Sequence, residues 1–235
     1  MQRLDKLLSE AGVASRKDLK AIIRAGRVRV NGVVVKSPEI KVDETTAEIC
    51  VDGQVIGKMR TAVVMLHKPA GYVTSTDDPR DRTVMELLPE AFRRLDVKPV
   101  GRLDKDTEGL LLFTNDGQLA HQILSPRHHV RKRYYAEHEG EAGPADVAAF
   151  AAGITLRDGE QCLPAVLKPL GPGKSLVEIH EGKYHQVRRM LASRGMPVSY
   201  LKRLAEGGLE LGDLPLGAVR EVSAEDLQRL VFEQL

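Results

Sequence analysis

The sequence is poor in cysteine, in aromatic residues and in long apolar stretches. Its two cysteines, Cys50 and Cys162, are too few and too isolated for a disulfide framework or a cysteine zinc site. No run of the ~18 uncharged apolar residues that a membrane-spanning helix needs is present. The first residues, MQRLDKLLSE, are charged throughout and lack the apolar core of a secretory signal. These absences predict a soluble, cytoplasmic protein with no membrane partner.

The composition nevertheless predicts a folded chain. Hydrophobic residues make up 42% of the 235 residues and charged residues 29%, which is enough to bury a core. The length lies between one and two ordinary domains.

The charge is unevenly distributed along the chain. Residues 1–42 contain ten basic and four acidic residues, a net charge of +6, so the remainder carries −4 because the whole chain is +2. A basic head on a mildly acidic body is typical of a polyanion-binding module joined to a second domain, although charge clusters are often only solvated surface.

The head has the pattern of two helices and a hairpin. Apolar residues recur at helical spacing from Leu4 to Ala11, and Ser15 with Asp18 forms a capping box for a second helix that Gly26 ends. The segment 27–35 follows, with Asn-Gly at its centre, which favours the type I′ turn of a β-hairpin.

The head lacks aromatic residues, so it cannot hold single-stranded bases by stacking. Lysines and arginines on a rigid helix pair can instead contact phosphates. The helix–helix–hairpin order and the core ASRKDLKAIIRAGRVRVNG resemble the S4 RNA-binding domain over about residues 2–45. The resemblance implies binding to structured RNA, and the candidate contacts in the head are Arg3, Arg16, Lys17, Lys20, Arg24 and Arg27.

The body, residues 61–235, is predicted to be a separate domain of the α+β class; the head and linker span residues 1–60. Strands are expected near residues 61–66, 110–113, 134–138 and 176–180, and a further strand end at 184–186. Helices are expected at 144–152 and after Ser223. Because regular helices do not separate most strands, we expect a mixed, largely antiparallel sheet.

Common metal and nucleotide motifs are missing. The histidines, which include His121, His128, His129 and His185, lack the spacing of a zinc site. No Walker loop, Gly-x-Gly-x-x-Gly or Gly-x-Ser-x-Gly occurs. The sequence therefore predicts no metal and no cofactor.

Three segments of the body can carry chemistry. A loop before the 110–113 strand offers the carboxylates Asp104, Asp106 and Glu108, among which composition does not choose. Lys132 and Tyr134 share one face of a predicted strand, and a cation beside a phenol suits a nucleobase. Two adjacent arginines, at 188 and 189, lie on the first turn of a predicted helix.

Together these segments resemble the RsuA-type family of pseudouridine synthases. The stretches KPAGYVTSTDDP, GRLDKDTEGLLLFTNDGQLAHQILSPRHHVRKRYYA and EGKYHQVRRMLASRG carry the resemblance, in that order behind an S4 head. It implies a catalytic aspartate at Asp104, a K-x-Y motif at Lys132 and Tyr134, and a basic partner of the aspartate at Arg188, with Arg189 as the neighbouring alternative. Arg102, Lys132 and Arg189 complete the implied RNA contacts.

The resemblance implies that a specific uridine is converted to its C5-linked isomer without cofactor or metal. The YHQ, STDDP and SPRHH forms resemble the branch that acts on small-subunit (16S) ribosomal RNA. The implied partner is ribosomal RNA, free or in an assembly intermediate, and the chain is expected to be a monomer. The alternatives are the same reaction on 23S RNA, a non-catalytic ribosome-assembly protein and, more weakly, a metal-dependent RNA hydrolase.

Overall fold

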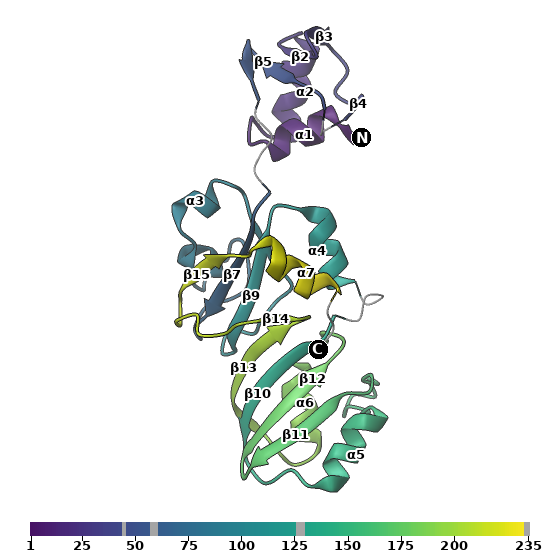
Figure 1. Ribbon diagram of the computed structural model, residues 1–235, viewed down its shortest axis with the longest axis vertical. Helices are drawn as coiled ribbons and strands as arrows, with labels where there is room; N and C mark the ends of the chain where they lie inside the picture. The colour runs from purple at the N-terminus through teal and green to yellow at the C-terminus, as the bar shows by residue number, and fades with distance from the viewer. Residues whose placement is uncertain (44–45, 57–60, 126–129, 233–235) are drawn as a thin grey trace. The chain divides into compact units, whose positions relative to one another are not determined.

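A computed structural model describes residues 1–43, 46–56, 61–125 and 130–232 of the chain (Figure 1). The chain divides into two compact units: residues 1–61 with 94–96, and residues 62–93 with 97–235. The predicted boundary at residue 60 lies outside the described residues, so it stays a prediction. No helix in the described part of the chain is both long and apolar enough to cross a membrane.

The N-terminal unit forms the two helices and the hairpin expected from its sequence. Helix α1 spans Leu4–Glu10 and α2 spans Arg16–Arg24. The Ser15 hydroxyl accepts a hydrogen bond from the Asp18 amide at 3.2 Å, which caps α2 as predicted. Asn31 and Gly32 have φ of 49° and 79°, as the type I′ turn requires.

Two small sheets complete this unit. Strands β3, β2, β5 and β6 form one of them in that order, and β1 pairs with β4 in the other. Their bounds are β1 Gln2–Arg3, β2 Val28–Val30, β3 Val33–Val35, β4 Lys41–Val42, β5 Ile49–Val51 and β6 Gln54–Val55. The core is aliphatic, and its fully buried members are Leu4, Leu8, Leu19, Ile23 and Val28.

The second unit is built on one nine-stranded sheet. The strand order is β11–β12–β10–β13–β9–β7–β15, and β8 and β14 pair with β9 and β13. The strands are β7 Val63–Lys68, β8 Lys98–Val100, β9 Glu108–Thr114, β10 Lys132–His138, β11 Val166–Gly171, β12 Lys174–Ile179, β13 Val198–Glu206, β14 Leu209–Glu210 and β15 Val219–Glu221. Among the described strands of this sheet every pairing is antiparallel except β9 with β13, so the predicted α+β class and mixed, largely antiparallel sheet are confirmed.

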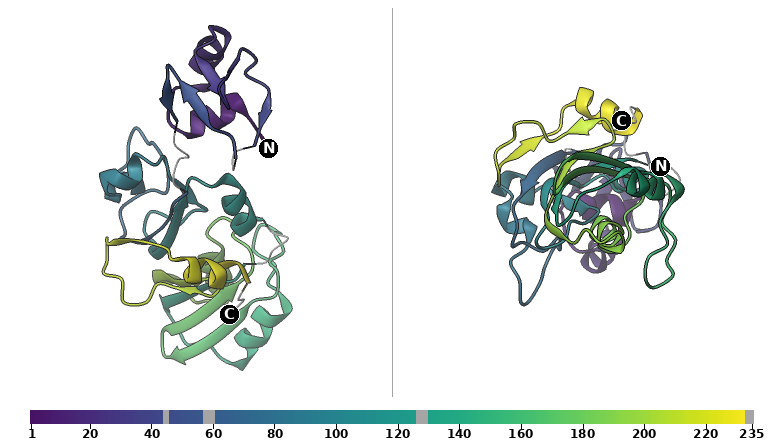
Figure 2. Two further views of the ribbon diagram at one scale, coloured as in Figure 1. Left: turned by 45° about the horizontal axis from the view of Figure 1, so that its top comes forward. Right: turned by 90° about the horizontal axis from the view of Figure 1, so that it is seen from below.

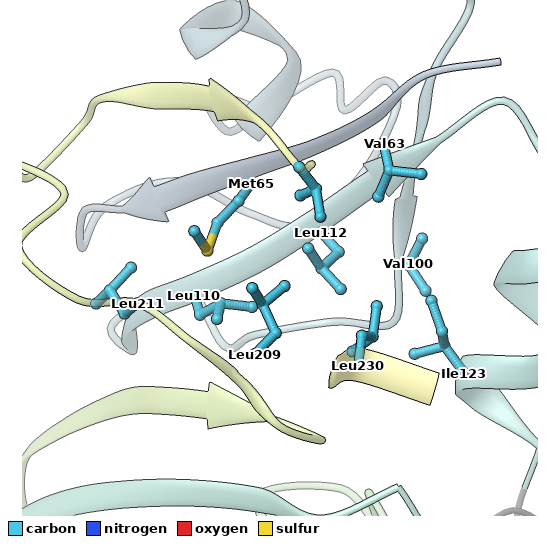
Figure 3. Packing of buried hydrophobic residues seen from close by; sticks show 10 residues of the cluster. Val63, Met65, Val100, Leu110, Leu112, Ile123, Leu209, Leu211 and Leu230 are labelled. Atoms are coloured by element: carbon cyan, nitrogen blue, oxygen red, sulfur yellow. The ribbon is translucent and has the colours of Figure 1, made fainter. Parts of the chain in front are cut away.

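Short helices flank the sheet (Figures 1 and 2). They are the 3₁₀ helix Val84–Leu87, α3 Glu90–Arg93, α4 Gly117–Leu124, α5 Pro144–Ala152, α6 Gln186–Ser193 and α7 Ala224–Phe232. Helix α5 packs on β11 and α6 packs on β13, whereas α7 packs on β14. Figure 3 shows the core between α7 and strands β7 and β9, where Met65, Leu110, Leu112, Leu209 and Leu230 meet.

Two features differ from the sequence prediction. The expected strand end at 184–186 is wrong: β12 already ends at Ile179, and His185 adopts a left-handed conformation at the start of α6. Helix α4 was not predicted, although Asp116 caps it by accepting hydrogen bonds from the amides of Gln118 and Leu119. The residues Asn115–Asp116–Gly117 are also typical of a turn, so the sequence did not distinguish a turn from a helix cap at Asp116.

The parallel contact between β9 and β13 brings distant segments together. Gly109 of β9 lies opposite Arg203 of β13, and a Cβ at Gly109 would be 2.2 Å from the Arg203 carbonyl oxygen. Only glycine permits this approach, and its φ of +113° is also one that side chains rarely adopt. The loop that precedes β9 therefore ends beside Arg203 of β13, and Tyr134 of β10 lies opposite Arg203 on the other side of β13.

Candidate active site

A cavity of ≈ 320 Å³ lies at this junction of β9, β10 and β13. The loop before β9 forms one wall, β10 and β13 form another, and the segment from the end of β12 to the start of α6 closes a third. The charged or titratable lining side chains, which are suited to a reaction or to binding RNA, are Arg102, Asp104, Lys132, Tyr134, His180, Glu181, Lys183, His185 and Arg203. The cavity thus brings together four of the predicted site residues.

The structure separates the three carboxylates among which composition did not choose. Asp104 lines the cavity, with its side chain 29% exposed. Asp106 forms an ion pair with Arg188 at 2.9 Å, and Glu108 accepts a hydrogen bond from the Tyr200 hydroxyl at 2.7 Å. Of the three, only Asp104 lines the cavity.

Buried hydrogen bonds hold the loop that carries Asp104. The Lys68 ammonium, which is fully buried, donates to the carbonyl oxygens of Asp104 at 3.0 Å and Thr107 at 2.9 Å, and also to those of Pro69 and Lys105. Burial lowers the pKa of Lys68 to about 8, although nearby carboxylates oppose the shift. Thr74 holds the preceding residue, because its hydroxyl donates to the Leu103 carbonyl at 2.7 Å and accepts from the Leu103 amide at 3.1 Å.

The titratable side chain found beside the Asp104 carboxylate is a histidine. His185 Nε2 lies 3.4 Å from Asp104 Oδ1, and the His185 ring stacks on Tyr184 with centroids 3.9 Å apart. His185 has φ of 48° and ψ of 33°, a conformation that costs a non-glycine residue roughly 1–2 kcal/mol. A strained residue that places its ring beside a carboxylate is typical of a functional site.

Tyr134 lies in the wall opposite this loop. Its side chain is 7% exposed, and burial raises the pKa of its phenol. The Arg203 guanidinium opposes that shift, whereas the carboxylates of Glu206 and Asp104 add to it. The raised pKa keeps the Tyr134 phenol protonated at neutral pH, so its hydroxyl can donate a hydrogen bond.

The other half of the K-x-Y motif faces the same cavity. Lys132 is 12% exposed and donates to the Val130 carbonyl at 3.1 Å. Both Lys132 and Tyr134 line the cavity, which confirms the predicted shared face.

The two arginines of α6 are held by other acids. Arg188 pairs with Asp106 and donates to the Val198 carbonyl at 3.2 Å, and it is not a lining residue of the cavity. Arg189 pairs with Asp158 and with Glu160, the latter at 2.9 Å. The role of Arg188 as the partner of Asp104, and that of Arg189 in RNA binding, stay predictions.

The candidate RNA contacts of the N-terminal unit fall into two groups. Lys17, Lys20 and Arg24 are exposed on α2. The other three are engaged: Arg3 and Arg16 pair with the buried Asp5 at 2.9 and 3.1 Å, and Arg27 pairs with Asp52 at 2.5 Å.

Sequence reasoning missed several residues of the site. Lys68 is only the first residue of the KPAGYVTSTDDP stretch, and Arg203 and Glu206 belong to none of the recognised motifs. His185 lacks the spacing of a zinc site and belongs to the YHQ motif, and neither feature indicates its position beside Asp104. Among the described residues no group of three or more His, Cys, Asp or Glu side chains could hold a metal ion, while His128 and His129 lie outside them.

Comparison with known protein families gives two matches along the chain. Residues 62–193 match the model of RNA pseudouridylate synthases, and residues 2–46 match that of the S4 domain. The first match covers the cavity except for its β13 residues, and the second covers the helix pair and hairpin.

Similar proteins span the whole chain. An RNA pseudouridine synthase of Bacillus subtilis is 40% identical over 233 residues, which are 97% of this chain and 98% of the relative. The ribosomal small subunit pseudouridine synthase A of Escherichia coli is 38% identical over 97% of this chain and 100% of its own length. The corresponding protein of Pseudomonas aeruginosa is 39% identical over 96% of this chain and 98% of its own length.

Among solved structures, a crystal structure of a pseudouridylate synthase superposes with a TM-score of 0.71 at 34% identity. It covers 98% of this chain and 100% of its own. The chain therefore belongs to the RsuA-type family of RNA pseudouridine synthases, which are isomerases, and carries an S4 domain at its N-terminus.

Proposed function

We propose that this enzyme isomerises a specific uridine of small-subunit (16S) ribosomal RNA, with Asp104 as the nucleophile. The observation that carries the proposal is that the Asp104 carboxylate and the Tyr134 phenol line one cavity, while the nearby Asp106 and Glu108 are bound to other partners. A carboxylate held on a braced backbone and facing a cavity is suited to nucleophilic catalysis.

The reaction needs the target base outside its stack. Extruding a nucleotide costs a few kcal/mol, which contacts to the base and flanking phosphates must offset. Asp104 then attacks the ribose C1′, or first promotes elimination to a glycal, and both routes break the bond from C1′ to N1. The freed uracil turns and its C5 bonds to C1′, which displaces the Asp104 carboxylate on the direct route or, on the glycal route, is accompanied by return of the proton to C2′. The proton lost from C5 is balanced by the one that N1 gains.

Tyr134 and the cations of the cavity bind the extruded nucleotide. The Tyr134 ring stacks on the base, and its protonated hydroxyl is suited to donate a hydrogen bond. Lys132 and Arg102 contact phosphates. Arg188 and Arg189 are proposed to act at the rim of the cavity. Arg188 can exchange its ion pair with Asp106 for one with Asp104, which is only two residues away in the sequence.

The choice of RNA is supported by the two relatives named as small-subunit enzymes. The S4 domain anchors phosphates away from the target and so supplies part of the binding energy. The same reaction on 23S RNA is the second candidate. We further propose that the enzyme acts as a monomer and accepts assembly intermediates of the subunit.

The test is Asp104→Asn, which removes the anion but keeps the size of the side chain. We expect loss of pseudouridine formation on saturating ribosomal RNA by at least about 1,000-fold, with RNA affinity and Tm nearly unchanged. Asp106→Asn is the matched control and should keep substantial activity. Wild-type turnover by Asp104→Asn would refute the assignment, and inactivity caused by unfolding would make Asp104 a structural residue.

The target RNA needs a separate measurement. Mass mapping of pseudouridine in 16S and 23S RNA from cells that lack the gene should show one missing site, in 16S RNA. A missing site in 23S RNA would favour the second candidate. If both RNAs keep all their sites while the protein still binds RNA, the non-catalytic alternative gains support.

A further inference from the structure

A buried carboxylate lies behind the Lys132–Tyr134 wall of the cavity. Glu206, the last residue of β13, lies directly opposite Lys132 in the pairing of β10 with β13, and its side chain is 1% exposed. Its Oε1 is 3.7 Å from Lys132 Nζ, and its Oε2 is 3.4 Å from Arg203 Nη2. One carboxylate is thus shared between two cations that are themselves largely buried.

The backbone fixes Glu206 in this place. The next residue, Gly207, has φ of +55°, and a Cβ there would lie 2.3 Å from the Leu230 carbonyl oxygen of α7. The Gly207 amide donates to the Arg131 carbonyl at 2.8 Å. Arg203 is also fixed, because its Nε donates to the Leu110 carbonyl at 2.7 Å. These contacts hold the backbone at Glu206 and the guanidinium of Arg203 in place.

The charges around Lys132 oppose one another. Burial lowers the pKa of Lys132, and the Arg203 cation lowers it further, whereas Glu206 raises it. The other charged or titratable side chains that line the cavity are Arg102, Asp104, Tyr134, His180, Glu181, Lys183 and His185. Glu206 is the acid that forms an ion pair with Lys132 in the described structure.

We propose that Glu206 is a positioning residue of the active site, which keeps the Lys132 ammonium charged and directed beside Tyr134 so that it can bind a phosphate of the extruded nucleotide. This inference rests on the proposed function, because it assumes that RNA enters this cavity. Glu206 touches no substrate in this scheme. It acts through Lys132. Because the nearby Arg203 cation disfavours the charged form of Lys132, an acid between the two cations is needed to keep Lys132 protonated.

The test compares the pH dependence of kcat/KM for wild type and Glu206→Gln on the same RNA. Without the anion, Lys132 should lose its proton at a pH about one to three units lower than in wild type. We expect KM for RNA to rise steeply with pH in the variant, while kcat changes less. Titration of uracil affects both proteins equally, so it cancels in the comparison. An equal loss at every pH, or a profile identical to that of wild type, would overturn the proposal.

Glu210→Gln is the matched control. Glu210 lies four residues further on in the neighbouring strand β14, is 61% exposed, and pairs with Arg133 at 2.6 Å. This variant removes the same charge outside the cavity and should keep the wild-type pH profile.

A second readout does not depend on activity. Titration of ¹³C-labelled lysine side chains by NMR, with Lys132 assigned through Lys132→Arg, should show a lower midpoint in Glu206→Gln than in wild type. An unchanged midpoint would overturn the inference even if the enzyme is active. If the wild-type protein forms no pseudouridine while Glu206→Gln still shows the lower Lys132 midpoint, only the proposed function is refuted.

Glu206→Asp covers the case in which Glu206→Gln does not fold. It keeps the anion but withdraws it by one methylene, so we expect a folded protein in which Lys132 loses its proton at a somewhat lower pH than in wild type. A wild-type profile for Glu206→Asp, together with an unfolded Glu206→Gln, would assign Glu206 to folding alone and overturn the proposal.

Discussion

The two units of the molecule use lysine and arginine in opposite ways. On α2 of the N-terminal unit Lys17, Lys20 and Arg24 are exposed, and that unit contains no aromatic side chain before residue 61. In the second unit Lys68 and Arg203 are fully or almost fully buried around the candidate site. Exposed cations bind phosphates at long range and are screened by salt, whereas buried cations fix geometry and protonation.

The largest effect that distinguishes the units is expected at Tyr134. Tyr134→Phe keeps stacking but loses the hydroxyl, so we expect RNA affinity near wild type and turnover lowered by about 100-fold or more. Tyr134→Ala should also lose affinity, by about 1–3 kcal/mol, because the base has no ring to stack on. Tyr135→Phe, on the opposite face of β10, serves as the control. Full activity of Tyr134→Phe would show that the hydroxyl has no chemical role.

Lys68 tests whether a buried cation stabilises the fold. Lys68→Met leaves carbonyl groups of residues 104, 105 and 107 without their donor, so we expect the free energy of unfolding to fall by about 1–3 kcal/mol, together with activity. Lys174→Met, at an exposed lysine of β12, should change neither. A Lys68→Met protein as stable as wild type would show that the loop is held without this lysine.

The same residue predicts a dependence of stability on pH. The folded pKa of about 8 lies below the unfolded value of 10.5, so the unfolded chain binds more protons between these pH values. The contribution of Lys68 to the free energy of unfolding therefore rises with pH from about 8 to 10.5. Urea unfolding across this range should show a steeper rise for wild type than for Lys68→Met, and parallel curves would contradict the lowered pKa.

Asp5 is the exception within the N-terminal unit, because it is a buried charge. The hydrogen bond from Arg3, and after it the bond from Arg16, holds the pKa of Asp5 below its usual value although burial opposes this. Its contribution to stability is present above about pH 4 and is lost as pH falls through the lowered pKa. Asp5→Asn should lower the Tm at pH 7 by several degrees and remove that acid-dependent part. An unchanged Tm would place Arg3 and Arg16 among the free RNA contacts.

The smallest effect is expected from the exposed cations. Replacing Lys17, Lys20 and Arg24 together by Gln should leave Tm unchanged but reduce the slope of log Kd against log salt by about 2–3, since each lost phosphate contact contributes about 0.7–0.9. Lys168→Gln with Lys174→Gln is a control in the second unit and should leave the slope unchanged. An unchanged slope in the triple variant would show that α2 does not bind the RNA backbone.

The N-terminal unit could be predicted in detail because its signals are local. Ser15 caps α2, Asn31–Gly32 forms the turn, and Leu4, Leu8, Leu19 and Ile23 form the buried stripe, all within short windows of sequence. In the second unit the same kind of signal placed α5 correctly between Pro144 and Gly153. It did not reveal α4, because Asp116 reads equally well as a turn residue and as a helix cap.

The site was predicted in part. The resemblance of the motifs assigned Asp104, Tyr134 and Lys132, and all three line the cavity. The partner that the structure places beside Asp104 is His185, while Arg188 contacts Asp106, two residues along the same loop. Whether Arg188 contacts Asp104 or Asp106 depends on how the loop backbone is held. Lys68 and Thr74, from a separate part of the chain, hold that backbone by hydrogen bonds.

The sequence by itself determined the helices, the hairpin, the basic head and the motifs of the family, because caps, turns and alternation act between neighbouring residues. Only the tertiary structure decided which carboxylate faces the cavity and which cations surround it. The physical reason is the parallel pairing of β9 with β13, which places Gly109 against Arg203, and Lys132 against Glu206 one strand further. Residues so far apart in sequence carry no local signal of that pairing, and burial there sets their protonation.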